Sequence, residues 1–199
     1  MKRIVVTILL MFMSYVVSGQ IIDSKNFDKK LFEKVLFDEV NQFRKSIGID
    51  TVVPSTVLYK KVSDVNAQKM SKYNVLKHFD FNMDTIIPEV ANESDKKYGG
   101  KVLRNYFGEI PCKSIGEICL VSSIKDFDKK ITYKELAQSF VQRWHNSPGH
   151  DWIMSYVYES KGLSGLASCA ISMNSSNIYA CFNFAELHRT LNMKPYVLH

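Results

Sequence analysis

The sequence predicts an α+β fold, a three-layer α-β-α sandwich with a small central antiparallel sheet covered by helices on both faces. Helical spacing of apolar residues dominates the first part of the chain, one short strand pattern follows in the middle, and a hairpin pattern closes the chain. No short alternation of strands and helices is present, which argues against a parallel sheet. Hydrophobic residues make up 46% of the 199 residues and charged residues 23%, without repeats, so we expect one globular domain.

Two helices are predicted in the first part of the chain. Residues 27–47 carry apolar side chains at helical spacing, and Gly48 follows as a plausible C-cap. A second helix is predicted over residues 55–73, which places His78 just beyond a helix end. The side chains of this second helix that we expect to face the core are Leu58, Val62 and Val65.

The middle of the chain is predicted to hold a long loop and a strand. Residues 80–100 mix Asn, Asp, Pro, Lys and a Gly-Gly pair, which is typical of a surface loop, and a short helix is predicted over residues 101–107. Residues 114–123 are rich in Ile, Leu, Val and Cys, which suits a short buried strand.

A capping box and a turn define the last elements. Thr132 and Glu135 have the spacing of a capping box, which predicts a helix that runs to the turn at residues 146–149. Two strands are predicted over residues 163–173 and 178–185, joined by an Asn- and Ser-rich turn into a β-hairpin.

The first residues of the chain indicate export. Residues 1–19 have a basic start, a short apolar stretch and small residues before Gln20, as in a cleaved signal peptide; an uncleaved anchor is the alternative. We expect a lead-in over residues 20–30, the folded domain over residues 31–187, a tail over residues 188–199, and a location outside the cell or in the periplasm. No stable membrane span is expected after cleavage.

Charge argues against a nucleic-acid partner. The formal net charge is +6, and losing Lys2 and Arg3 with the leader would remove two of these charges. The Lys-Lys pairs are scattered among acidic residues, as on a solvated surface, and they form no basic stripe. The domain is large enough to complete its own core, so we expect a monomer.

Four cysteines in an exported chain allow three complete disulfide pairings. We expect Cys169 to pair with Cys181 across the predicted hairpin, which leaves Cys112 to pair with Cys119. The alternative is four buried free thiols, because Cys is also a good small core residue.

Four segments of the chain, at residues 40–48, 78, 116–118 and 144–150, resemble motifs of the CAP superfamily of cysteine-rich secretory, antigen 5 and pathogenesis-related proteins, also known as the SCP domain. Residues 144–150 resemble the W-x-x-S-P-G-H motif of bacterial members, and residues 40–48 resemble the V-N-x-x-R-x-x-x-G helix. His78 is similar to the first histidine of the family, and residues 116–118 resemble its G-E-N segment. The resemblance implies an α-β-α sandwich with a central groove. The motif residues to which it gives structural roles are Asn41, Arg44, Trp144, Ser147, Pro148 and Gly149.

The chain departs from the family pattern in three places. Ile118 stands for the usual Asn, and Asp151 stands where bacterial members usually have Arg. Ser147 occupies the position of the second acidic residue of the four-residue site, so only a triad carries over.

That triad is His78, Glu117 and His150, which the resemblance brings to one polar cleft. Two imidazoles and a carboxylate suit Zn²⁺ or a similar divalent cation, although no cofactor is required. The same residues are the candidates for general base chemistry, and a structural hydrogen-bond network is the alternative. No nucleophile is marked, since Ser147 sits in a turn where its hydroxyl can satisfy the backbone. His145, His188 and His199 are expected at the surface.

The function expected from the resemblance is that of an exported, non-catalytic binding module. Its cleft would take an ion, a small apolar ligand such as a lipid, or a protein partner. The alternative is a metal-dependent, peptidase-like hydrolase with two His ligands and Glu117 as base, although the chain lacks an H-E-x-x-H motif. A third hypothesis is a structural envelope protein.

Overall fold

The structure of the chain, a computed structural model, describes residues 19–98, 113–125, 130–155 and 165–187. Within them the helices are η1 (Ser24–Asn26), α2 (Lys29–Ser46), α3 (Thr56–Leu58), η2 (Tyr59–Ser63), α4 (Asp64–Tyr73), α5 (Met83–Tyr98), α6 (Tyr133–His145) and α7 (Pro148–Met154). The strands are β1 (Val53–Pro54), β2 (Lys113–Ser123), β3 (Leu166–Met173) and β4 (Asn177–Leu187).

Four strands form one sheet in the order β1-β3-β4-β2. β4 lies in the centre, antiparallel to both β2 and β3, which confirms the predicted hairpin. β1 pairs parallel to β3 through only Val53 and Pro54, so the sheet is mixed and not purely antiparallel as predicted. A two-residue strand that contains a proline has no alternation for sequence reasoning to detect.

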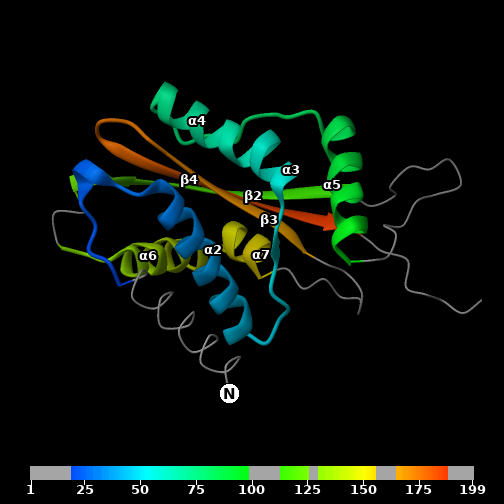
Figure 1. The fold of residues 1–199 in the computed structure, drawn as a ribbon, viewed down its shortest axis with the longest axis horizontal. Coiled ribbons are helices and arrows are strands. Elements are labelled where there is room, and N and C mark those ends of the chain that lie inside the picture. The colour runs from blue at the N-terminus through cyan, green and yellow to red at the C-terminus, as the bar shows by residue number, and fades with distance from the viewer. Residues whose placement is uncertain (1–18, 99–112, 126–129, 156–164, 188–199) are drawn as a thin grey trace, which may run out of the picture.

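Helices cover both faces of this sheet, as Figure 1 shows. α2, α6 and α7 lie on one face, while α3, α4 and α5 lie on the other. The larger core fills the first face, with Phe32, Phe140, Trp144 and Phe182 fully buried. The predicted α+β sandwich is thus confirmed. The edge strands of the sheet are β1 and β2.

The helix boundaries follow from local capping. The Asp28 side chain accepts a hydrogen bond from the backbone N–H of Leu31 at the start of α2. At the start of α6, the Thr132 side chain accepts from the backbone of Glu135, and the Glu135 carboxylate accepts in return from the backbone of Thr132. The predicted capping box is therefore confirmed.

The second predicted helix is continuous but contains an irregular turn. α3, η2 and α4 follow one another without a break, and η2 is a π-helical turn. Leu58 and Val62 before the end of this turn are fully buried as predicted, but Val65 after it is 38% exposed. A π turn inserts an extra residue into the helix, so the buried face shifts to Ala67 and Met70.

The loop predicted over residues 80–100 is wrong, because α5 occupies most of that segment. Ile86, Ile87, Val90 and Ala91 are buried at helical spacing against α3 and the sheet. Pro88 lies inside the helix on its exposed side, and this proline together with the polar flanks favoured the loop interpretation. The helix predicted over residues 101–107 lies outside the described residues.

The expected Cys169–Cys181 disulfide is wrong. Both thiols are free, and Cys169 is paired in register with Phe182 while Cys181 is paired with Ala170. Because side chains alternate along a strand, this offset of one residue places the two sulfurs on opposite faces of the sheet. Cys119 is also a free thiol, and Cys112, its expected partner, lies outside the described residues.

Among the described residues, no helix combines the length and apolar character needed to cross a bilayer. The expected signal peptide, residues 1–19, lies outside the described part except for Gly19, and the expected tail, residues 188–199, lies wholly outside it, so the expected domain boundaries stay predictions.

Candidate metal site on the edge strand

Glu117 is the fixed point of the site. It lies in β2, the edge strand, and projects onto the face covered by α4, where its side chain is only 7% exposed. Its Oε2 accepts hydrogen bonds from Asn66 Nδ2 at 2.5 Å and Asn183 Nδ2 at 3.0 Å. Cys181 Sγ donates to the same oxygen at 3.1 Å. Three donors therefore hold one carboxylate oxygen, and the other oxygen is left to face His78.

His78 reaches Glu117 from the loop that follows α4. That helix ends at Asn74, which adopts a left-handed conformation with φ of 53°. The Asn74 side chain accepts a hydrogen bond from the hydroxyl of Tyr179 in β4 at 2.7 Å, which ties the start of the loop to the sheet. Four residues later His78 Nδ1 lies 2.8 Å from Glu117 Oε1, while the imidazole remains 60% exposed. The ring is oriented by a buried carboxylate and faces solvent.

Cys119 completes the cluster from the same strand. It follows Glu117 by two residues, so both side chains project onto the same face of β2. Cys119 Sγ lies 4.0 Å from His78 Nδ1, and the residue is buried. One ligand atom each from His78, Glu117 and Cys119 lies within 4.8 Å of the others.

Charge and burial shift the pKa values of these three groups. The pKa of His78 is raised to about 9 by the Cys119 sulfur and, against the opposing effect of burial, by the closer Glu117 carboxylate. Burial raises the pKa of Glu117, but hydrogen bonds from Asn183, Cys181, Asn66 and His78 outweigh it and lower the pKa overall. The interaction with the Cys181 sulfur, opposed by burial and assisted by His78, lowers the pKa of the Cys119 thiol. At neutral pH without a metal, His78 is thus a cation.

His150 reaches this edge of the sheet from the opposite face. It lies on α7, which packs so closely on β2 that a Cβ added at Gly116 would meet Ile153 Cγ2 at 2.8 Å. Burial and the positive charge of His78 lower the pKa of His150, so the two imidazoles interact electrostatically. The cluster within 4.8 Å nevertheless does not include His150, and its side chain makes no hydrogen bond to the residues described.

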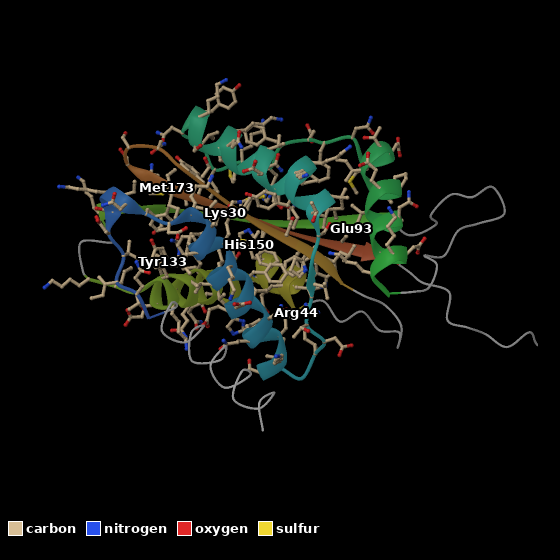
Figure 2. The ribbon with its side chains drawn as sticks, viewed as in Figure 1. Lys30, Arg44, Glu93, Tyr133, His150 and Met173 are labelled. Atoms are coloured by element: carbon tan, nitrogen blue, oxygen red, sulfur yellow. The ribbon has the colours of Figure 1, made fainter. Side chains whose placement is uncertain are left out.

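The motif residues with expected structural roles lie around α2, α6 and α7. Arg44 is 1% exposed and donates from its guanidinium to the backbone oxygen of Met154 at 2.7 Å, which ties α2 to the end of α7. Figure 2 shows Arg44 and His150 in this layer of helices. Asn41 donates to the Val52 carbonyl at 3.0 Å and accepts from the Val52 N–H at 2.8 Å. These contacts hold the helices in place and involve no site chemistry.

The remaining motif residues shape the turn into α7. Trp144 is fully buried, and its indole N–H donates to the backbone oxygen of Cys119 at 3.3 Å. Ser147 is the N-cap residue of α7 without a side-chain capping bond, and Pro148 occupies the first turn. The space around Gly149 is open.

Asp151, in the first turn of α7, has a local partner. Its carboxylate lies 2.7 Å from His145 Nδ1 at the end of α6. The pair joins α6 to α7 at the surface, where the His145 side chain is 47% exposed, as expected for this residue. His188 and His199 lie outside the described residues.

A cavity of about 480 Å³ lies away from these residues, between α2 and α3 at the free edge of β3. Lys30, Glu33 and Tyr59 line it and bond to one another. It shares no lining residue with the His78 cluster. The candidate site is therefore separate from this cavity, and it combines the exposed ring of His78 with the buried side chains of Glu117 and Cys119.

A nitrogen, an oxygen and a sulfur donor in one place suit a borderline transition metal such as Zn²⁺. The ligands would be His78, Glu117 and Cys119, with the exposed side of His78 left open for a further ligand. A bound metal would supply Lewis acidity, and the chain would supply a carboxylate already oriented by Asn66 and Asn183.

Sequence reasoning selected His78 and Glu117 but missed their neighbours Asn66, Cys119, Cys181 and Asn183. The signal for three of them is alternation, since Cys119 lies two residues from Glu117 on β2, and Cys181 lies two residues from Asn183 on β4. Asn66 could not be found this way, because its position depends on how α4 packs on the sheet.

No protein-family model matches the sequence, and no curated protein does either. Solved structures with a similar fold include the following two. One is an extracellular protein with an SCP domain from Bacillus anthracis str. Ames, with 13% identity and a TM-score of 0.43, covering 77% of this chain and 40% of that one. The other is the CAP domain of Enterococcal PrgA, with 14% identity and a TM-score of 0.34, covering 88% of this chain and 69% of that one. Both are SCP or CAP domain proteins, and this chain spans less than half the length of the Bacillus protein.

Proposed function

We propose that this chain is an exported binding module whose edge-strand site takes a divalent transition metal of the zinc class. His78, Glu117 and Cys119 would be its protein ligands. The observation that supports this proposal is the approach of an imidazole nitrogen, a carboxylate oxygen and a thiol sulfur to within 4.8 Å of one another. The exposed His78 ring gives the metal a route in from solvent.

Binding must displace protons from the site. His78 has a pKa of about 9, so its ring is protonated at neutral pH, and Cys119 binds a metal only as the thiolate. A metal ion therefore competes with protons at these groups, and its apparent affinity should rise with pH.

The environment of Glu117 favours binding over hydrolysis. In the hydrolase hypothesis Glu117 would accept a proton from an attacking water. Its side chain is 7% exposed, and its pKa is lowered by four hydrogen-bond donors, so it is both hard for water to reach and a weak base. As a metal ligand, Glu117 would need only to present a carboxylate oxygen to the ion. The hydrogen bonds that hold this side chain in place favour that role.

Cobalt titration tests the proposal. Reduced, metal-free protein titrated with Co²⁺ should develop the near-ultraviolet absorption of a cobalt–thiolate bond and saturate at one ion per chain. Cys119→Ser should lose that absorption. The matched control is Cys169→Ser, which removes a buried thiol on the opposite face and should leave the spectrum unchanged. Saturable binding that survives in Cys119→Ser with an unaltered spectrum would refute the proposed ligand set.

A further inference from the structure

Cys119 and Cys181 face each other across the edge of the sheet. They are directly opposite in the antiparallel register of β2 and β4. Opposed residues of such strands have Cα atoms about 4.5 to 5.5 Å apart. Disulfides span Cα distances of about 4.4 to 6.8 Å, so the strands already hold these cysteines at a bridging separation.

Both sulfurs also lie on the same face. Cys119 and Cys181 belong to the core cluster beneath α4, together with Ala67 and Met70. Both are free thiols, 4% and 0% exposed, and Cys119 is the one next to the exposed ring of His78. A small solute that reaches the site from the His78 side thus meets Cys119 first and Cys181 behind it.

The third described thiol has no such opportunity. Cys169 is buried on the opposite face of the sheet, in the core beneath α2 and α6. Among the cysteines that the structure describes, Cys119 and Cys181 are therefore the pair with a shared face and a matching register.

We propose that Cys119 and Cys181 are a redox pair that closes into an intrachain disulfide when a peroxide oxidises the site. The Cys119 sulfur attacks one peroxide oxygen, the O–O bond breaks, and a sulfenic acid forms while the departing hydroxide takes the Cys119 proton and leaves as water. The Cys181 sulfur then attacks the Cys119 sulfur, the S–O bond breaks, and the second hydroxide takes the Cys181 proton and leaves as water. Two thiols lose two electrons in total, and the peroxide is reduced to two waters.

Disulfide formation would also remove a metal ligand. Cys119 in a disulfide has no thiolate to offer, so oxidation should release a metal held by His78, Glu117 and Cys119. Bound metal should in turn protect Cys119 from oxidation. This coupling rests on the proposed function, whereas the disulfide itself does not.

Peptide mapping after oxidation tests the pair. Reduced protein treated with hydrogen peroxide and then with a thiol-alkylating reagent should show an intact mass lower by two hydrogens before alkylation, and a peptide that links Cys119 to Cys181. Trypsin alone leaves Cys169 and Cys181 in one peptide, residues 162–189, so chymotrypsin is needed to cut between them after Tyr179. A link between Cys119 and Cys112, or no link at Cys119, would overturn the proposal.

Two variants and a zinc-binding measurement distinguish failure of the redox pair from failure of the metal site. Cys169→Ser should still form the link, while Cys181→Ser should leave a sulfenic acid at Cys119 that a dimedone-type reagent traps. If the link forms but reduced protein binds no zinc, the metal function fails and the redox pair stands. If zinc binds but oxidation leaves Cys119 unlinked, the redox pair fails and the metal function stands.

Discussion

The Cys119 sulfur and the Glu117 carboxylate, whose Oε1 lies 2.8 Å from the ring nitrogen, together raise the pKa of His78. Glu117→Gln replaces an anionic acceptor with a neutral amide, so we expect the pKa of His78 to fall below about 9 in metal-free protein. Disturbing this buried acceptor should also cost about 1 to 3 kcal/mol of stability. NMR titration of the histidine ring signals measures the pKa. An unchanged His78 titration would contradict the account.

The raised pKa of His78 also predicts how stability depends on pH. The folded-state pKa of about 9 exceeds the ordinary histidine pKa of 6.5, so the folded protein holds this proton more tightly than the unfolded chain. The resulting stabilisation is fully present below pH 6.5 and is lost as the pH rises towards about 9. The side chain is 60% exposed, so salt should weaken the effect.

Chemical denaturation of reduced, metal-free protein measures this effect. The free energy of unfolding of the wild type, minus that of His78→Gln, should shrink between pH 6.5 and about 9. A difference that stays constant or grows over that interval would show that His78 is not held as a cation in the folded state.

At the scale of elements, the close approach of α7 to β2 depends on Gly116. A Cβ at this position would meet Ile153 Cγ2 at 2.8 Å, so Gly116→Ala must move the side chain or the helix. We expect a loss of about 1 to 3 kcal/mol in the free energy of unfolding, as for other overpacked sites. Gly149→Ala is the matched control, because no heavy atom lies within 4 Å of its added Cβ. Equal stability of the two variants would refute the packing argument.

The elements that sequence predicted well carry their own local signals. α2 has a continuous apolar stripe, α6 has a capping box, and the β3–β4 hairpin has two apolar runs around a polar turn. α5 was missed although Ile86, Ile87, Val90 and Ala91 follow helical spacing, because Pro88 and the polar flanks suggested a loop. β1 was missed because its pairing with β3 is set by tertiary structure and leaves no pattern in two residues.

At the scale of the whole molecule, sequence reasoning reached the sandwich architecture and two of the three donor residues. The third donor, Cys119, was considered either for a disulfide with Cys112 or as a buried free thiol, since counting cysteines gives no information about which strand faces which. The register of β2 against β4 places Cys119 opposite Cys181 and beside Glu117. His150, the other histidine expected in this cluster, lies on α7 and is not among the residues whose ligand atoms come within 4.8 Å of one another.

X-ray absorption spectroscopy of zinc-loaded, reduced protein tests the central claim most directly, because it counts the ligands around the ion. The account predicts one sulfur ligand at about 2.3 Å, together with nitrogen and oxygen ligands at about 2.0 to 2.2 Å. The sulfur shell should disappear in Cys119→Ser and persist in Cys169→Ser. A zinc ion surrounded only by nitrogen and oxygen in the wild type would contradict the proposed site.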